Sequence, residues 1–489
     1  MQDNKNLSEI EIEDQRIIEN KELNLLESLI PVVILMSLLA INIFFIEGQE
    51  WFGGYTNQYI LLIGGVAAAA VGFFNKVSLK TMIVEVWENW KSVFVPIMIL
   101  FLVGALAGTW LVSGIIPAMV YYGLQVLSPA IFLPASVIIA AIISIATGSS
   151  WTTSATVGIA LIGIGSALGI PTGMIAGAVI SGAYFGDKMS PLSDTTNLAP
   201  AMAGTDLFTH IKYMAYTTVP TILITLIVFA ILSGTIDTSG NADISNLLVS
   251  IDNTFNITPL LFIVPGAVIA MILMKTKPLI ALGVGVLLAA IFAFIFQGDV
   301  LQNLSDSKFQ SLLNAVLTDT SIETDDEKLS ELFSSGGMNG MLWTIYLIIC
   351  AMVFGGIMDA IGALAKITKS LLSIATSVFG LFASTVVSCL GLNVVASDQY
   401  LALVIPGKMF KKAYQDRGLA PENLSRTLED SGTVTSVLIP WNTCGAYQSG
   451  VLGVGVGEYF MYAIFNWLSP FTTLLFAALN LKIRMLRGK

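Results

Sequence analysis

The stretch GDKMSPLSDTTN, residues 186–197, decides how the rest of the chain is interpreted. It holds two aspartates, a lysine, a proline and several hydroxyl side chains, yet it stands between the apolar segments AGAVISGAYF (176–185) and LAPAMAG (198–204). Unwinding a helix in hydrocarbon strands backbone donors and acceptors, each at a cost of several kcal/mol. The stretch is therefore either an exposed loop or a break in a membrane helix. In the second case, protein groups, water or a ligand must form hydrogen bonds with the backbone groups that the break leaves unpaired.

The composition favours the membrane. Of the 489 residues 55% are hydrophobic and 11% are charged, and the mean hydropathy is +0.81. The chain contains several apolar runs of the length, about 20 residues, that crosses a bilayer as a helix. We expect an all-α polytopic membrane protein with a single transmembrane domain, residues 29–489, of roughly ten to twelve helical elements and no soluble catalytic domain.

The charged residues fall mostly outside the apolar runs. The net charge is −10, and sixteen of the 33 acidic residues lie in residues 1–28 and 299–331, which we interpret as solvated surfaces. Neither a cationic partner nor nucleic acid is expected. The acid-rich start is unlike a signal peptide, so residues 1–28 are predicted to form a cytoplasmic tail. Three cysteines, Cys350, Cys389 and Cys444, fit no zinc or redox spacing and are predicted to be packing residues.

Basic residues set the orientation of the spans, which are expected to begin near residues 29, 58, 92, 213, 257, 278, 341 and 456. Lysine and arginine gather in connections that can all lie on one side, including the turn KTK at 275–277 and the C-terminal stretch LKIRMLRGK. The connections at 48–57 and 235–256 contain neither residue type. By the positive-inside rule both termini are expected to be cytoplasmic.

Two regions of the chain have the same order of parts. In residues 92–211 a span precedes an apolar run ending in ATGSSWTTSATVG (146–158) and a Gly-rich run that breaks at the opening stretch. In residues 341–452 a span precedes an apolar run ending in GLNVVASDQ (391–399) and then DSGTVTSVLIPWNTCGAYQSG (430–450). The first span starts inside and the second outside, which predicts two inverted-topology repeats with re-entrant hairpins and broken transmembrane helices.

Helices interrupted at matching positions of inverted halves point to the central site of a transporter. We therefore expect the breaks at 187–197, 391–399 and 433–445 to meet near the membrane midplane. The hydroxyl-rich GSSWTTSAT upstream and the small residues around the first break, which permit close backbone approach, favour this interpretation over an exposed loop. Hydropathy leaves open whether residues 133–166 form a re-entrant hairpin or two full crossings.

The breaks supply the oxygen ligands that hard cations take. The candidate ion- and substrate-binding residues are Ser150, Thr152, Asp187, Ser190, Ser193, Asp194, Thr195, Thr196 and Asn197 in the first half, and Asn393, Ser397, Asp398, Asn442 and Thr443 in the second. Asp194 and Asp398 are the predicted sodium ligands. Asp194 is preferred over Asp187 because Lys188 stands beside Asp187 and can neutralise it in an ion pair.

Other polar residues have a structural or an open interpretation. Glu429 and Asp430 follow a basic loop and are predicted to be surface charges or partners of Arg426. Asp359 is either a second protonatable group or a surface acid. Trp151 lies in a break, where an anchoring or packing role is the default for tryptophan.

Sodium and protons can compete for one carboxylate in such a site, because desolvation favours the protonated form and a bound cation favours the ionised form. If the site opens alternately to either side, this competition couples sodium movement to proton movement in the opposite direction. The first break has no histidine or cysteine that would favour a transition metal. No cofactor is expected, and sodium enters as the transported substrate.

Other function classes are less well supported. The only histidine, His210, lies outside the breaks, and neither GxSxG nor HExxH occurs, which disfavours an enzyme. Asp187 or Asp194 with Asp398 could in form serve as an aspartic protease pair. A channel would need similar polar groups but no inverted breaks, so a secondary transporter is favoured.

The segments GSSWTTSATVGIALIGIGSALGIP (148–171) and AGAVISGAYFGDKMSPLSDTTNLAPAMAGTDLFTHIKYM (176–214) resemble the signature region of the NhaC-type sodium/proton antiporters, in the ion transporter superfamily. The features of the second half extend the resemblance over most of the chain. It implies Na+/H+ antiport across the inner membrane of a bacterium or archaeon by a fold of two inverted repeats. Na+, H+ and membrane lipid are the expected partners, with a homodimer as an open alternative to a monomer.

The resemblance does not fix the substrate, since related members are Na+-coupled malate/lactate antiporters and some relatives handle amino acids. Exchange of malate or lactate is therefore the alternative function. Dicarboxylate recognition usually uses arginine, and the breaks contain no arginine and only one basic residue, Lys188. This favours cation-only exchange, although half-helix N-termini can also bind carboxylates.

Overall fold

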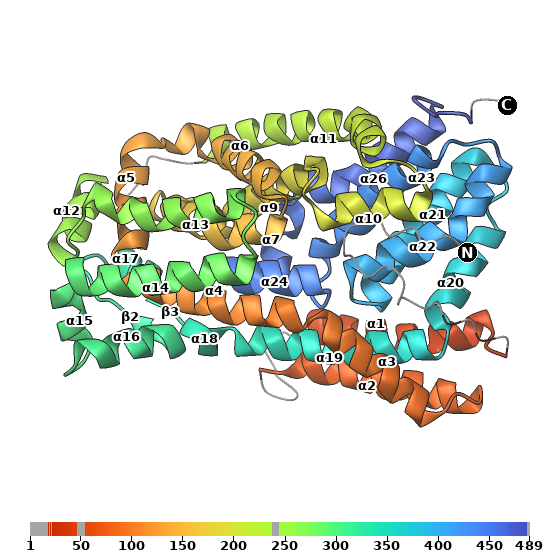
Figure 1. Ribbon diagram of the computed structural model, residues 1–489, viewed down its shortest axis with the longest axis horizontal. Helices are drawn as coiled ribbons and strands as arrows, with labels where there is room; N and C mark the ends of the chain where they lie inside the picture. Colours follow the sequence, from red (N-terminus) through yellow and green to blue (C-terminus); the bar gives the residue numbers. More distant parts are fainter. Residues whose placement is uncertain (1–17, 19, 21, 46–53, 237–243, 487–489) are drawn as a thin grey trace.

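The computed structural model describes residues 18, 20, 22–45, 54–236 and 244–486, and the predicted tail, residues 1–28, lies mostly outside them. The described chain is almost entirely helical, with most helices along the long axis of the molecule (Figure 1). In these ranges the only sheet is the antiparallel pair β2 (Thr320–Ser321) and β3 (Ser334–Ser335). The predicted all-α class is confirmed.

The helices run in the following order. The first part of the chain forms α1 (Leu25–Phe45), α2 (Thr56–Phe74), α3 (Leu79–Ser92), α4 (Phe94–Val112), α5 (Ile115–Val126), α6 (Pro129–Thr147), α7 (Ser150–Thr153), the π-helix η2 (Ser154–Gly158), α8 (Ile159–Ala167), α9 (Thr172–Met189), α10 (Asp194–Ala203) and α11 (Leu207–Thr235). The middle part forms α12 (Ile244–Thr254), the 3-10 turn η3 (Pro259–Phe262), α13 (Ile263–Leu273), α14 (Pro278–Phe296), α15 (Gly298–Leu304), α16 (Lys308–Leu317), α17 (Glu327–Leu332) and α18 (Gly337–Gly340). The last part forms α19 (Leu342–Ala360), α20 (Ala363–Ser373), α21 (Val378–Val395), α22 (Gln399–Asp416), α23 (Pro421–Leu428), the π-helix η4 (Glu429–Thr433), the 3-10 turn η5 (Ser436–Leu438), α24 (Thr443–Leu452), α25 (Val456–Tyr459), the 3-10 turn η6 (Phe460–Tyr462) and α26 (Ile464–Ala478).

Eight of the described helices are long and apolar enough to cross a membrane, and two bent helix pairs raise the number to ten. Their starts agree with the predicted ones to within a few residues, as for α14 at Pro278 and α2 at Thr56. Their outer faces carry exposed apolar side chains, such as Leu287, Ile291 and Ile295 on α14. Apolar surface of this extent faces lipid. The protein is a multi-pass membrane protein.

The first complicated region contains the predicted hairpin and the predicted broken helix. The chain turns back at Gly148, whose φ of +69° suits glycine, so that α7, η2 and α8 return beside α6. Helix α9 runs along α6 in such close contact that a Cβ on Gly186 would lie 2.4 Å from the carbonyl oxygen of Ala141. After α9 the chain unwinds and restarts as α10.

The second complicated region has the same parts. Helices α21 and α22 form a hairpin whose turn contains Ser397 at a φ of +60°. Helix α23 continues into η4 and η5, the chain unwinds, and α24 follows. The parts therefore follow the predicted order in both halves, while their inverted-symmetry relation stays a prediction.

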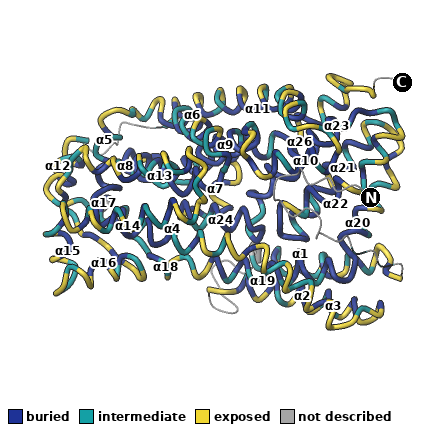
Figure 2. The backbone as a smooth tube through the Cα atoms, in the orientation of Figure 1, coloured by how far each residue is buried: buried dark blue, intermediate teal, exposed yellow. Residues whose placement is uncertain are grey.

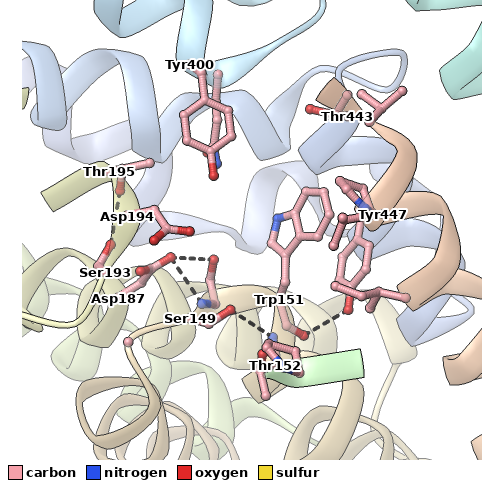
Figure 3. Close-up of a pocket in the computed structure, with 18 of the residues that line it drawn as sticks. Ser149, Trp151, Thr152, Asp187, Ser193, Asp194, Thr195, Tyr400, Thr443 and Tyr447 are labelled. Atoms are coloured by element: carbon pink, nitrogen blue, oxygen red, sulfur yellow. Dashed lines mark hydrogen bonds between the residues drawn. The ribbon is translucent and has the colours of Figure 1, made fainter. Parts of the chain in front are cut away.

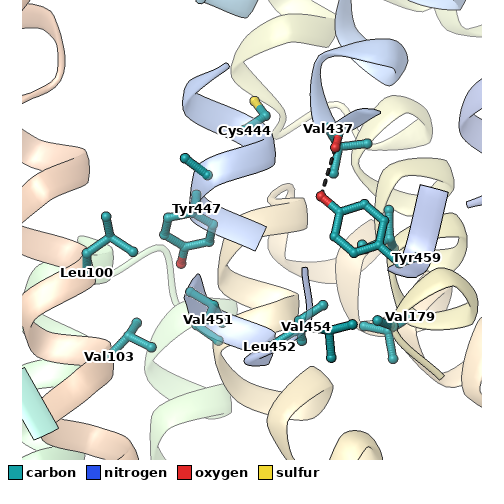
Figure 4. Close-up of a cluster of buried hydrophobic side chains, with 14 of the residues drawn as sticks. Leu100, Val103, Val179, Val437, Cys444, Tyr447, Val451, Leu452, Val454 and Tyr459 are labelled. Atoms are coloured by element: carbon teal, nitrogen blue, oxygen red, sulfur yellow. Dashed lines mark hydrogen bonds between the residues drawn. The ribbon is translucent and has the colours of Figure 1, made fainter. Parts of the chain in front are cut away.

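The core lies where the two halves pack together. Buried residues concentrate along the middle of the molecule, and exposed ones along the outer helices such as α11 (Figure 2). Figure 4 shows one cluster, in which Tyr447, Val451 and Leu452 of α24 lie with Leu100 of α4 and Val179 of α9. This apolar packing covers one side of α24, and the polar side of the break before it faces elsewhere.

Candidate functional site

A partly open cavity of about 460 Å³ lies where the breaks meet (Figure 3). The first break contributes Asp187, Ser193, Asp194 and Thr195, and the hairpin turn before it contributes Ser149, Ser150, Trp151 and Thr152. The second half contributes Asp398, Gln399, Tyr400, Thr443 and Tyr447. The three breaks meet as predicted, whereas their position near the membrane midplane stays a prediction. The start of α4 and the turn between α13 and α14 complete the wall.

Four helices begin at the breaks around the cavity, and each begins with a side chain that suits a helix N-terminus. Ser149, Ser193, Asp398 and Asn442 are the N-cap residues of α7, α10, α22 and α24, and each accepts a hydrogen bond from a backbone N–H of the first turn. Asp398 Oδ1, for example, accepts from the N–H groups of two residues at 2.8 and 3.0 Å. The caps satisfy backbone donors that the breaks would otherwise leave unpaired in the membrane.

The carboxylate of Asp187 is held in place by the hairpin turn. Its Oδ2 accepts hydrogen bonds from the Ser150 backbone N–H at 3.1 Å and from the Ser150 hydroxyl at 2.7 Å. The side chain is 9% exposed and reaches the cavity from the last turn of α9. Asp187 therefore joins the broken helix to the hairpin as well as lining the cavity.

The carboxylate of Asp194 is in a different position. Asp194 is in the first turn of α10, is exposed within the cavity and accepts no hydrogen bond from any described residue. In Figure 3 it points toward the open space beside Asp187 and below Tyr400. Asp187 and Asp398 each accept two hydrogen bonds, so Asp194 has the least occupied carboxylate of the three acids in the cavity.

The predicted ion pair between Asp187 and Lys188 is wrong. Consecutive helical residues point about 100° apart, so Lys188 faces away from the cavity while Asp187 faces it. The Lys188 ammonium instead forms a buried ion pair with Asp430. The preference for Asp194 as the cation ligand is thus kept for a new reason, the hydrogen bonds that occupy Asp187.

The predicted surface positions of Glu429 and Asp430 are also wrong. Both side chains are fully buried, because η4 packs against α21, α22 and α23 inside the protein. Arg426 pairs with neither acid and lies over the ring of Tyr213, 4.6 Å from its centroid. The burial of these two acids depends on tertiary packing, because the local sequence pattern is that of a polar loop.

Several predicted site residues brace the breaks and do not line the cavity. In the first half three side chains donate hydrogen bonds to backbone carbonyls: Ser190, Thr196 and Asn197. In the second half Asn442 Nδ2 donates to Asn393 Oδ1 at 3.2 Å, and the Thr443 N–H donates to the Ser397 carbonyl at 3.0 Å. These contacts hold the unwound segments together, which leaves eight predicted residues in the cavity wall: Ser150, Thr152, Asp187, Ser193, Asp194, Thr195, Asp398 and Thr443.

Sequence reasoning missed an aromatic part of the cavity wall. Trp151 and Tyr447 stack with ring centroids 3.9 Å apart and an interplanar angle of 14°. Tyr400 and Lys277 also line the cavity. Trp151 stood in a break and was the one available signal, since the other three become neighbours only in the fold. Asp359 is buried at the end of α19 and lies outside the cavity lining.

The cavity is not a preformed metal centre. No group of three His, Cys, Asp or Glu side chains within the described ranges is placed to hold one metal ion. A cation would instead take one or two carboxylate oxygens together with hydroxyl, carbonyl and water oxygens, as weakly held hard cations do. The arrangement suits an ion that must leave again.

Comparison with known proteins agrees with this geometry. The model of the Na+/H+ antiporter family matches residues 182–481. The chain is 38% identical over 423 residues to the Na(+)/H(+) antiporter NhaC of Alkalihalophilus pseudofirmus, covering 86% of this chain and 90% of that protein. It is 36% identical over 413 residues to NhaC of Bacillus subtilis (84% and 89%), and 38% identical over 376 residues to the Malate-2H(+)/Na(+)-lactate antiporter of Bacillus subtilis (76% and 78%). The chain therefore belongs to the Na+/H+ antiporter family.

Proposed function

We propose that this protein is a secondary transporter, not an enzyme, that exchanges Na+ for H+ across the cell membrane of a bacterium or archaeon. The observation that carries the proposal is that Asp187 and Asp194 of the first break and Asp398 of the second half line one cavity in a membrane protein. Ionisable groups inside membranes are costly and mark ion pathways and proton relays. The two NhaC relatives, named as Na(+)/H(+) antiporters, support the same function.

In the proposed mechanism Asp194 is the exchange group. A sodium ion binds its carboxylate, with Asp398 and the hydroxyls of Ser193 and Thr195 as further oxygen ligands. When sodium leaves, a proton takes its place, because a bare carboxylate is unfavourable in a partly desolvated site. Asp187, held by Ser150, adds negative charge that concentrates cations in the cavity.

Two cavities favour alternating access. The main cavity reaches Ser92 and Lys277, which stand in lysine-bearing connections. A second cavity of about 190 Å³ reaches Asn57, next to the connection 48–57 without Lys or Arg, and Trp343, next to the connection 298–340 with only Lys308 and Lys328. Its wall shares α24 and the break before it with the main cavity. By the positive-inside rule the main cavity opens to the cytoplasm and both termini are cytoplasmic. The segment containing α24 would then separate the two sides.

Exchange by the purified protein in sealed proteoliposomes tests the proposal. With a pH indicator inside, sodium added outside should raise the internal pH as protons leave in exchange for sodium. The same sodium addition should move no protons in vesicles without protein. Sodium entry without proton counter-movement would indicate a channel, and no sodium-dependent movement would refute the proposal.

Sodium-coupled exchange of an organic anion is the second candidate, favoured by the size of the cavity. Its volume of about 460 Å³ far exceeds that of one sodium ion, and Lys277 offers a positive charge at its wall. The similarity to the malate/lactate antiporter points the same way. In vesicles loaded with malate or lactate, this candidate predicts anion-dependent sodium flux that Lys277→Gln weakens more than Lys275→Gln, a change in the same turn outside the cavity lining.

A further inference from the structure

A second group of charged side chains lies behind the cavity wall. Lys188 of α9 and Asp430 of η4 form an ion pair in which both side chains are at most 1% exposed. The second oxygen of Asp430 accepts a hydrogen bond from the Thr217 hydroxyl at 2.8 Å. The ammonium of Lys188 also lies over the ring of Phe465. Asp430 thus has a partner for each oxygen, as a buried ionised carboxylate requires.

Glu429, the neighbour of Asp430, has no such partners. It is 0% exposed, and neither carboxylate oxygen has a hydrogen-bond partner among the described residues. Lys188 is near enough to act on its charge, but that ammonium is bound to Asp430. With all three groups ionised, this cluster would carry one uncompensated negative charge in the interior. A buried unpaired charge costs far more than the neutral acid, so the group neutralises instead.

We propose that Glu429 is a second proton-binding residue of the exchange cycle, distinct from the sodium-binding acids of the cavity. It holds a proton in the conformation described here and releases it in a conformation in which the cluster is opened to water. On release, the Glu429 O–H bond breaks, the proton passes to water, and the Lys188 ammonium together with the entering water stabilises the carboxylates of Glu429 and Asp430. The inference rests on the proposed function, because it concerns how many protons accompany each sodium ion.

The last turn of α9 links the two sites. Asp187 lines the cavity, and the next residue, Lys188, belongs to the cluster with Glu429 and Asp430. A movement of this turn therefore alters both the cavity and the cluster. The chain unwinds directly after the turn, and η4 is a π-helical segment. Unwound and π-helical backbone has more than one way to satisfy its carbonyls, which allows such a movement.

The surroundings of Glu429 contain other groups that titrate. Asp187, Asp430 and Lys188 are near enough to act on its charge, and its charge in turn acts on the Cys389 thiol of α21. The buried guanidinium of Arg426 lies three residues earlier on α23, over the ring of Tyr213. Lys188 also acts on His210, whose Nδ1 is 2.8 Å from the Ser425 hydroxyl on α23 and whose Nε2 has no described partner. Polar groups thus continue from the cluster along α23 toward the end that carries Glu422.

Glu422 brings this polar path to the surface. Its carboxylate is 2.6 Å from the Arg484 guanidinium, and the Arg484 side chain is 45% exposed. The path along α23 lies apart from the cavity, since neither His210 nor Glu422 lines the cavity. A proton on Glu429 therefore has a polar way out that does not cross the sodium site.

The number of protons per sodium tests the inference. In proteoliposomes with the membrane potential held at zero, net exchange stops at a sodium concentration ratio that depends on the stoichiometry. That ratio equals the proton concentration ratio raised to the power n, where n is the number of protons exchanged per sodium ion. Across one pH unit, an exchanger of two protons stops at roughly a hundredfold sodium gradient and an exchanger of one at roughly a tenfold gradient. We expect the hundredfold value for the wild type and for Glu88→Gln, a change at a surface ion pair, and the tenfold value for Glu429→Gln.

Glu429→Met is the second variant, because a neutral acid without hydrogen-bond partners should be replaceable by an apolar side chain of similar size. Both variants should fold and keep sodium counterflow, which needs no net proton movement. A wild-type ratio of one proton, or an unchanged ratio of two in the variants, would overturn the inference. So would the failure of both variants to fold, since it would mean that Glu429 carries a structural charge. A wild type without any sodium-dependent proton flux would refute the proposed function itself.

Discussion

Replacement of Asp194 by asparagine isolates the charge of the proposed exchange group. Asp194 is exposed within the cavity and accepts no hydrogen bond from a described residue, while the N-cap of α10 is formed by Ser193. Asparagine has nearly the same shape. The loss to folding is limited to the interaction of the acid with the helix N-terminus, about 0.3–1 kcal/mol. Asp194→Asn should therefore be a folded protein with one charge removed from the cavity.

The expected effect on sodium binding follows from Coulomb's law. Hard cations lie about 2.5 Å from oxygen ligands. In a partly open cavity with an effective dielectric constant of about 40–80, two unit charges at this distance attract each other by about 1.7–3.3 kcal/mol. Since about 1.4 kcal/mol corresponds to a factor of ten, the sodium Kd should rise roughly 20- to 250-fold. Exchange should be lost as well, because an amide cannot carry the proton.

Equilibrium binding of radioactive sodium to the purified protein measures the Kd directly. Asp306→Asn is the matched control, since Asp306 is also exposed but lies between α15 and α16, outside the cavity lining. Its Kd should equal that of the wild type. If Asp194→Asn also bound sodium with the wild-type Kd, Asp194 would not be a sodium ligand, and Asp187 and Asp398 would remain as candidates.

Three further predictions concern the cavity and its support. Asp187→Ala should lower the Tm more than Asp194→Ala, because it leaves the Ser150 N–H without an acceptor at a cost of about 1–3 kcal/mol, and equal shifts would contradict the bracing role. Gly186→Ala should destabilise the contact of α6 with α9 by about 1–3 kcal/mol, whereas Gly283→Ala, with nothing within 4 Å of the added Cβ, should be neutral or stabilising; equal Tm losses would exclude the close approach as the cause. For the wild type, lowering the pH should raise the apparent sodium KM of exchange roughly tenfold per pH unit below the pKa of the shared acid, with an unchanged maximal rate. A constant KM with a falling maximal rate would indicate a separate regulatory group.

Much of the site could be predicted because the membrane makes polar residues informative. Hydrocarbon excludes unpaired backbone groups and charges. Acids within apolar segments, such as those at positions 187, 194 and 398, are therefore expected to face a polar cavity inside the protein. Proline and short hydroxyl side chains marked where helices stop and restart. These signals act over a few residues and are therefore visible in the sequence.

What the sequence did not predict depends on long-range packing. Lys188 and Asp430 are 242 positions apart, and nothing near either residue indicates the other. The buried position of Glu429 likewise depends on helices from other parts of the chain that surround η4. The stacking of Trp151 on Tyr447 joins the two halves in the same way. Local patterns located the breaks but could not say which polar residues turn inward and which brace the backbone.

The central claim is that sodium ions and protons bind alternately to the acids of the cavity. The most direct test of this claim is to measure proton release when sodium binds. Sodium is added to the purified protein in weak buffer near neutral pH, and the released protons are counted with a pH indicator. The wild type should release protons in proportion to the sodium bound, with potassium as the inactive control cation, and Asp194→Asn should lose the release that belongs to the cavity. Saturable sodium binding by the wild type without any proton release would contradict the claim.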